Sequence, residues 1–355
     1  MLLLPRAFYA DNVTDWLDAI RAVADALPPA NAGKTVEHIH TTYSFSPYTP
    51  AAAALTARLC GAGCAGIVDH DTLAGAREFL AACDRLSLRP LLGLEHRVSF
   101  KGTPFEDAFL NDPLERGVAY MTMQRVVPGM AAFLTDAFAP RREARLVRER
   151  AVAERAAEKF PEAGLSFERD VLPLTRYRNG GTVTERHVLF ALSLRLTAAY
   201  GRGKRLADTL SRAGVRLTEE RKNRLSDEEN PYLLYDLAHM LKSDVLDSIY
   251  VPAAEECMTL EEFAALSRKA GAVCCYCYLG DVTASVTDDK RPGRFEDAYL
   301  PELLRFLKER GVGAVTHSRR RNSPKQTERL LELCRTLSLE TIEGEDINSP
   351  RQTFL

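Results

Sequence analysis

The stretch TVEHIHTT, residues 35–42, begins the pattern that decides the fold. It reads as a short strand and is followed by a helix-like segment, TPAAAALTARLCGAG (49–63), and a second strand, CAGIVDHD (64–71). A further helix-like segment, LAGAREFLAACDRLS (73–87), precedes a third strand, RPLLGLEHRVSF (89–100). Strands and helices that alternate at this spacing indicate βαβ units, and therefore an α/β fold with a parallel sheet.

The alternation is interrupted once and then returns. We expect a helical preface over residues 1–32, the first part of the α/β body over 33–100, a helical insertion or lid over 101–247 and the second part of the body over 248–355. Within the insertion, PRREARLVRERAVAERAAEKF (140–160) predicts a charged helix with a solvated face.

Composition limits the classes of function. The 355 residues are 46% hydrophobic and 27% charged, which is typical of a globular protein, and the net charge is −2. Without a basic stripe, nucleic-acid binding is not expected. The eight cysteines form no disulfide framework, and no apolar stretch is long enough to span a membrane, so we expect a cytoplasmic protein with reduced thiols.

Polar residues gather at the ends of the predicted strands. The carboxyl ends of parallel strands form the active face of such folds, and residues i and i+2 of a strand point the same way. A pair of histidines and carboxylates from other strands would make a mixed nitrogen and oxygen site suited to Zn, Mn or Fe. The alternative is that these side chains only cap strands and bond loop backbones. The residues are His38, His40, Asp69, His70, Asp71, Glu95, Asp346 and Asn348.

Three segments carry a resemblance to a known family. VEHIHTTYS (36–44), GIVDHDTLAGA (66–76) and RPLLGLE (89–95) resemble the motifs HxHTxxS, TDHDTxxG and GxE of the PHP family, named for polymerases and histidinol phosphatases. ERHVLFAL (185–192) resembles a later motif of that family. The resemblance implies a distorted (β/α)7 TIM-like barrel of the PHP type, with metal ions at the carboxyl ends of its strands and phosphoesterase activity.

The resemblance also implies roles for individual residues. His38, His40, Glu95 and Asp346 would hold a first divalent ion, with Glu95 bridging to a second. His187 would bind the second ion, and His70 would belong to a third site or be shared. The candidates for catalysis are Asp346, His187 and Tyr278, the last to stabilise an oxyanion or to orient a water.

The chain departs from the family motifs at three places. Phe45, Tyr278 and Asn348 stand where the family has metal ligands. We therefore expect an intact first site, one or two ions per chain and His70 left mostly alone.

Two functions remain open from the sequence. The first is hydrolysis of a small phosphorylated metabolite by a metal-activated water. Its phosphate could be held by Arg319, Arg320 and Arg321, which otherwise form a solvated turn. The second is a catalytically degenerate barrel that binds a ligand or protein partner without turnover. For His317 the sequence leaves three roles open: a catalytic acid, an extra metal ligand or a structural residue.

Overall fold

The structure of the chain is a computed structural model that describes residues 18–21, 23, 27, 29–283 and 293–354. Most of the helix predicted for the preface, including Trp16, lies outside the described residues. Residues 18–21 are helical, and the Ile20 side chain is buried in the same hydrophobic cluster as the barrel strands. This part of the preface packs on the α/β body.

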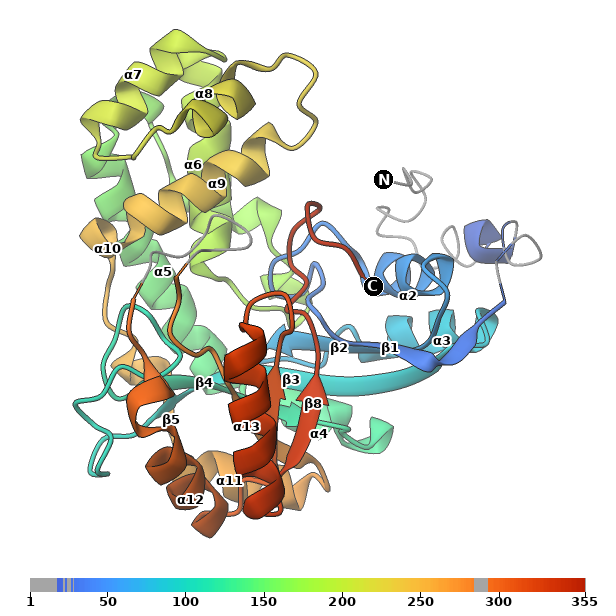
Figure 1. Ribbon diagram of the computed structural model, residues 1–355. Helices are drawn as coiled ribbons and strands as arrows, with labels where there is room; N and C mark the ends of the chain where they lie inside the picture. Colours follow the sequence, from blue (N-terminus) through green and yellow to red (C-terminus); the bar gives the residue numbers. More distant parts are fainter. Residues whose placement is uncertain (1–17, 22, 24–26, 28, 284–292, 355) are drawn as a thin grey trace.

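The strands form one sheet that curves into a nearly closed barrel (Figure 1). Around the sheet the order is β1-β2-β3-β4-β6-β7-β8, and the short β5 pairs with β3. A backbone bridge between Ile39 and Ile347 brings the segment after β8 against β1. The α/β barrel predicted from the sequence is confirmed. Its strands are β1 (Asn31–Ile39), β2 (Ala62–His70), β3 (Arg89–Ser99), β4 (Val118–Gln124), β5 (Met258–Thr259), β6 (Val273–Cys277), β7 (Ala314–His317) and β8 (Glu340–Glu343).

The strand β4 was not expected. It lies within residues 101–247, for which the sequence predicted helices, and it runs antiparallel to both β3 and β6 while the remaining neighbours pair in parallel. VAYMTMQ has the apolar character of a buried strand, and its polar residues Thr122 and Gln124 are buried as well. Since β3 and β4 are antiparallel, a loop can join them without a crossover helix, and the helical rhythm is lost there.

Helices cover the outside of the barrel. Two of these helices begin with side-chain caps: the Thr49 side chain accepts a hydrogen bond from Ala52 N, and Thr259 and Glu262 form a capping box. Figure 1 shows α11, α12 and α13 grouped on one side of the sheet. The barrel helices are α2 (Pro50–Leu59), α3 (Ala76–Arg85), α4 (Ala131–Ala137), α11 (Leu260–Lys269), α12 (Leu300–Glu309) and α13 (Pro324–Thr336).

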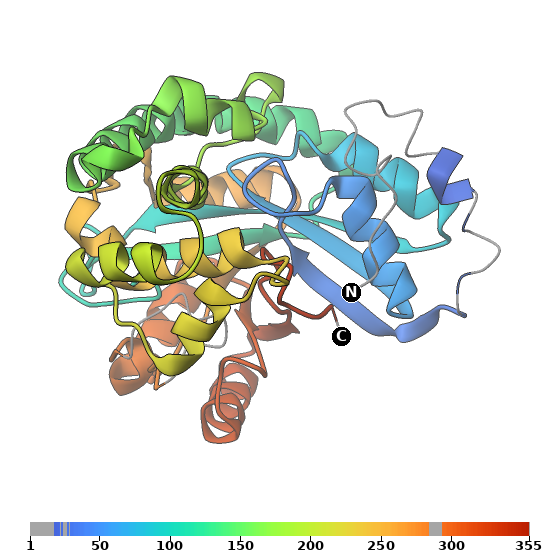
Figure 2. The same cartoon turned by 90° about the horizontal axis from the view of Figure 1, so that it is seen from above.

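The insertion has a hydrophobic core of its own. Its buried apolar residues run from Leu146 to Ile249, whereas Leu134 and Phe138 belong to the barrel core. Figure 2 shows its green and yellow helices beside the strands of the barrel. None of the described helices is long and apolar enough to cross a membrane. The insertion helices are α5 (Ala139–Lys159), α6 (Glu185–Tyr200), α7 (Lys204–Arg212), α8 (Glu219–Ser226), α9 (Leu233–Asp244) and α10 (Leu246–Ile249).

The charged helix α5 differs from the prediction of a solvated face. Arg142, Arg145, Arg148 and Glu149 are all buried, and Arg145 is 1% exposed. Their spacing of three and four residues places them on one side of the helix, together with Val152. The helix therefore turns part of its charge inward.

Candidate metal centre

A cleft opens where the carboxyl ends of the barrel strands face the insertion. Strand-end residues form its floor, and its walls come from the loop between β3 and β4, the first turn of α6 and the α9–α10 corner. The structure thus brings together most of the predicted metal ligands from both parts of the barrel. Those that line the cleft are His38, His40, His70, Glu95 and Asp346.

The first group of donors joins the two ends of the barrel. The nitrogen and oxygen atoms that His38, His40 and Asp346 offer all lie within 4.8 Å of one another, and His40 Nε2 is 3.1 Å from Asp346 Oδ1. Both histidines are buried, and His38 Nε2 has no hydrogen-bond partner among the described residues. A buried nitrogen without a partner is costly unless something else binds it.

Glu95 links this group to a second one. Its Oε1 lies 3.9 Å from His38 Nε2, and its Oε2 lies 3.8 Å from His40 Nε2 and 3.3 Å from His70 Nδ1. His40, His70 and Glu95 also meet within 4.8 Å, and the His40 and His70 rings stack with centroids 4.8 Å apart. The expectation that His70 is left mostly alone is therefore wrong.

These separations fit metal coordination. Bonds of about 2.0–2.2 Å to nitrogen and oxygen place neighbouring donors of one ion roughly 3.0–3.5 Å apart. Two of the separations that involve Glu95 and Asp346, at 3.1 and 3.3 Å, lie in this range, and the other two, at 3.8 and 3.9 Å, are slightly longer. Because the orphaned His38 nitrogen lies inside this set, the residues present are suited to hold a divalent ion, or two that share His40 and Glu95.

Hydrogen bonds behind His40 determine which of its nitrogens is left for an ion. The hydroxyls of Ser44 and Thr41 both donate to the Asp69 carboxylate, at 2.6 Å each. Because the Ser44 hydrogen is directed to Asp69, the Ser44 oxygen is left to accept from His40 Nδ1, 3.2 Å away. Nε2 then faces the carboxylates. Asp69 therefore orients His40 through the Ser44 hydroxyl.

The charges of the site follow from burial and pairing. Burial lowers the pKa of His40, but the hydrogen bond to Asp346 and the nearby carboxylate charges outweigh burial and raise it. Burial raises the pKa of Asp346, yet the hydrogen bond and charge of His40 hold it well below its usual range. Burial, followed by the charge of His40, lowers the pKa of His38 to about 3. His38 is therefore a neutral imidazole at pH 7, which is the form that binds metals.

His187 does not join either donor group. Its Nδ1 accepts a hydrogen bond from Thr184 N at the start of α6, where the two residues form a capping box. The Phe45 ring packs edge-on against the imidazole with centroids 5.2 Å apart, and Phe190 packs on Phe45. The position where the family has a ligand is thus filled by an aromatic contact, and the structure lends His187 no role as a ligand or in catalysis.

Tyr278 and Asn348 also have other partners. The Tyr278 hydroxyl donates to the Asp297 carboxylate, so it is not directed at the donor groups, although the residue lines the cleft. The Asn348 side chain donates from Nδ2 to Asp346 Oδ1 at 2.8 Å. Asn348 therefore holds the carboxylate that faces His40.

The arginine triplet separates into three environments. The Arg319 side chain is 71% exposed and pairs with Glu343 at 2.7 Å. Arg320 is exposed, and its backbone N–H donates to Glu345. Arg321 alone of the three lines the cleft, with Nη2 3.6 Å from Asp346 Oδ2. The prediction that all three hold a phosphate is not supported for Arg319 and Arg320.

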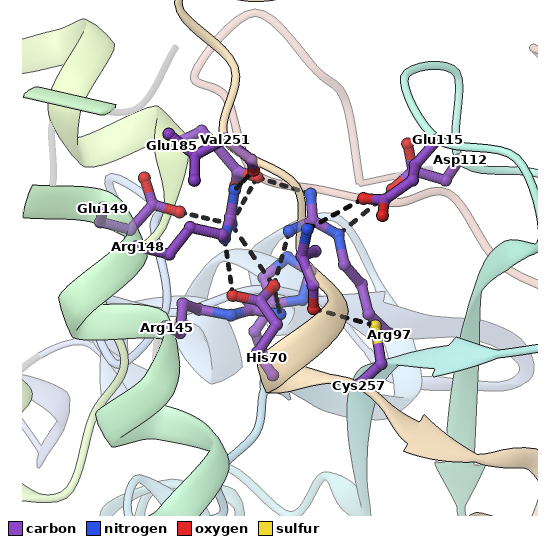
Figure 3. Close-up of polar contacts among 12 residues, drawn as sticks. His70, Arg97, Asp112, Glu115, Arg145, Arg148, Glu149, Glu185, Val251 and Cys257 are labelled. Atoms are coloured by element: carbon purple, nitrogen blue, oxygen red, sulfur yellow. Dashed lines mark hydrogen bonds and ion pairs between the residues drawn. The ribbon is translucent and has the colours of Figure 1, made fainter. Parts of the chain in front are cut away.

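A buried network of charges, which sequence reasoning missed, lies beside the centre. Figure 3 shows Arg97, Arg145 and Arg148 converging among carboxylates, with His70 next to them. Arg97 donates to Asp112, Glu185 and Glu256, and it lines the cleft two residues after Glu95 on the same face of β3. The spacing of Arg142, Arg145 and Arg148 was the signal that could have revealed it. The network consists of Arg97, Arg145, Arg148, Asp71, Asp112, Glu149, Glu185 and Glu256.

The solved structures most informative for this chain share its fold. One is the crystal structure of a candidate metal-dependent phosphoesterase from Bifidobacterium adolescentis, with a TM-score of 0.61 and 22% identity over 92% of this chain and 90% of that chain. The other is an amidohydrolase from Chromobacterium violaceum with bound sulfate and no metal, with a TM-score of 0.55 and 16% identity over 90% of this chain and 89% of that chain.

These comparisons confirm the fold that the PHP resemblance implied. Because the matches extend over about nine-tenths of both chains, they include most of the insertion as well as the barrel. No protein-family profile and no curated protein matches the sequence.

The hydrogen bond behind His40 predicts the effect of a small substitution. Ser44→Ala removes the acceptor for His40 Nδ1 and frees the ring to rotate, so the affinity for Zn²⁺ should fall by about 10–100-fold. Competition with a chromophoric chelator measures this. Ser46→Ala is the matched control, because the Ser46 hydroxyl accepts from Tyr48 N and not from a histidine. Equal affinities for the two variants would contradict the assignment.

The buried His187 predicts a pH dependence of stability. Burial lowers its pKa to about 3, so between pH 3 and 6.5 the unfolded chain binds a proton that the folded chain does not. Stability is then lost as the pH falls below 6.5, by up to about 1.4 kcal/mol per pH unit for this group. His187→Gln keeps a capping-box residue without titrating. Urea unfolding of the metal-free proteins at pH 7 and 4.5 should show a smaller loss for this variant, and equal losses would contradict the prediction.

Proposed function

We propose that the chain is a metal-dependent phosphoesterase that hydrolyses a small phosphorylated compound. The observation that carries the proposal is the pair of donor groups that share His40 and meet at Glu95. Paired sites of this kind suit hydrolysis, because two ions close together can act on the attacking and the leaving oxygen of a phosphate. The fold supports the proposal, since one protein with the same fold is described as a candidate metal-dependent phosphoesterase and another as an amidohydrolase.

The roles of the residues follow from their positions. His38, His40 and Asp346 would hold one ion together with Glu95 Oε1, and His70 with Glu95 Oε2 would face a second. A divalent ion in this place would lower the pKa of a bound water and polarise a phosphoryl oxygen. Asn348 keeps the Asp346 carboxylate turned toward His40.

Of the three arginines of the triplet, Arg321 is the one placed to hold the substrate phosphate. Its side chain is 23% exposed, it lines the cleft, and its guanidinium lies beside the Asp346 carboxylate. A guanidinium can donate two parallel hydrogen bonds to a phosphate. With Arg321 in the turn after β7 and the donor groups on the floor of the cleft, a bound phosphate would sit between them.

Metal content tests the proposal first. Protein purified without chelator should contain about one or two equivalents of Zn, Mn or Fe by elemental mass spectrometry, and should hydrolyse at least one compound in a panel of phosphate esters. His40→Ala should lose both the metal and the activity, because His40 belongs to both groups. His187→Gln is the matched control and should keep its metal.

The opposite results have clear meanings. If the protein takes up no metal even on reconstitution, the proposal is wrong and the barrel is better understood as a binding module. If it holds metal and yet hydrolyses no phosphate ester, the metal centre stands and the substrate class is wrong.

The arginine triplet gives a sharper test of substrate binding. Arg321→Ala removes charged hydrogen bonds worth about 1.5–3 kcal/mol, so kcat/KM for the phosphate ester should fall by about 10–100-fold with metal content unchanged. Arg319→Ala changes a neighbouring arginine whose partner is the exposed Glu343, and its kcat/KM should stay within about threefold. Similar losses in both variants would show that the triplet acts only through the general charge of its loop.

A further inference from the structure

The thiol of Cys277 lies at the edge of the candidate metal centre. Cys277 is the last residue of β6, and its Sγ is 3.8 Å from Glu95 Oε1. Among the described residues that line the cleft it brings the one sulfur atom. Cys275, two residues earlier on the same face of the strand, is packed instead with Ala314 and Ile342. The two cysteines therefore have different surroundings, a carboxylate in one case and apolar side chains in the other.

A second observation points to a ligand at the same place. His38 Nε2 is buried, has no hydrogen-bond partner among the described residues and lies 3.9 Å from the same Glu95 Oε1. One carboxylate oxygen thus lies near both a histidine nitrogen and the thiol that donates to it, although the thiol belongs to neither of the two groups whose donors meet within 4.8 Å. Since a tetrahedral ion with bonds of about 2.1 Å to oxygen and 2.3 Å to sulfur places these two donors about 3.6 Å apart, the observed 3.8 Å is close to that of two ligands of one ion.

We propose that Cys277 is an additional ligand of the candidate centre and directs it toward thiophilic ions such as Zn²⁺ in preference to Mn²⁺ or Mg²⁺. The inference rests on the metal site of the proposed function. Sulfur ligands select Zn²⁺, whereas carboxylates and water suit Mg²⁺ and Mn²⁺ equally well. On binding, the sulfur–hydrogen bond breaks, the sulfur–metal bond forms and one proton leaves to solvent for each ion bound.

Cobalt provides a direct readout that does not depend on activity. The metal-free wild-type protein, loaded with Co²⁺, should show an intense near-ultraviolet band from charge transfer between sulfur and cobalt. Cys277→Ser should lose this band, and Cys275→Ser, the matched control on the same face of β6, should keep it. In competition with a chelator, Cys277→Ser should bind Zn²⁺ more weakly by about tenfold or more, while its affinity for Mn²⁺ changes much less.

A measurement on the unaltered chain covers the case in which Cys277→Ser does not fold. Alkylation of the wild-type protein, mapped by peptide mass spectrometry, should be slowed by Zn²⁺ at Cys277 and not at the exposed Cys60. If the protein binds Co²⁺ or Zn²⁺ without a charge-transfer band and without protection of Cys277, the inference is wrong and the metal site stands. If neither ion binds, the proposed function fails, and the inference fails with it.

Discussion

The backbone bridge between Ile39 and Ile347 is the contact on which the candidate centre depends. His40 N donates to Ile347 O, and Ile347 N donates to His38 O, each at 2.9 Å. These two hydrogen bonds lie between residues from opposite ends of the described chain, and they set Asp346 beside the histidines. His38, His40 and Asp346 flank this bridge and form the first group of candidate metal ligands. The contact that closes the barrel therefore also assembles that group. The entropy cost of closing a loop grows only slowly with its length, so the great sequence separation of the two segments adds little to it.

The buried charges hold the insertion against the barrel. The barrel and the insertion have separate hydrophobic clusters, so apolar packing within each does not fix the position of one against the other. Arg97 from β3 and Arg148 from α5 both pair with Glu185 of α6 and with Glu256. Burying ions costs several kcal/mol each unless they are well paired, so only a narrow range of arrangements satisfies the network. The same pairing anchors Arg97 and, two residues before it, Glu95.

Burial and neighbouring charges shift the pKa values of the glutamates in this network in opposite directions. Burial raises the pKa of Glu149 well above its usual range, although the charge of Arg148 acts in the opposite direction. The pKa of Glu185 is held well below its usual range, because the neighbouring arginines outweigh the effect of burial. The charges of Arg145 and Arg97 lie close enough to His70 to add to the effect of burial and of His40 in lowering its pKa. Burial, the charge of His40 and these two arginines therefore favour a neutral His70, whereas the charge of Glu185 acts in the opposite direction.

Much of the fold could be predicted from the sequence because parallel strands and their helices leave strong local patterns. His38, His40 and Glu95 were recognisable because they stand at strand ends in a shared motif, and the structure places them together. The strand β4 was missed since an antiparallel strand without a crossover helix has no such rhythm. The inward face of α5 was missed because charge alone does not say which side of a helix meets a partner, and Glu185 and Glu256 are distant in sequence.

The departures from the family motifs are where sequence reasoning reached its limit. It could say that Phe45, Tyr278 and Asn348 are not the expected ligands, but not what they do. Each has a defined partner: Phe45 packs on His187, the Tyr278 hydroxyl bonds Asp297, and Asn348 holds Asp346. The three side chains therefore make contacts that close off these positions or support a neighbouring candidate ligand. Asn348 Nδ2 donates to the same Asp346 oxygen that lies 3.1 Å from His40 Nε2, so this departure from the motif holds the carboxylate of the first donor group in place.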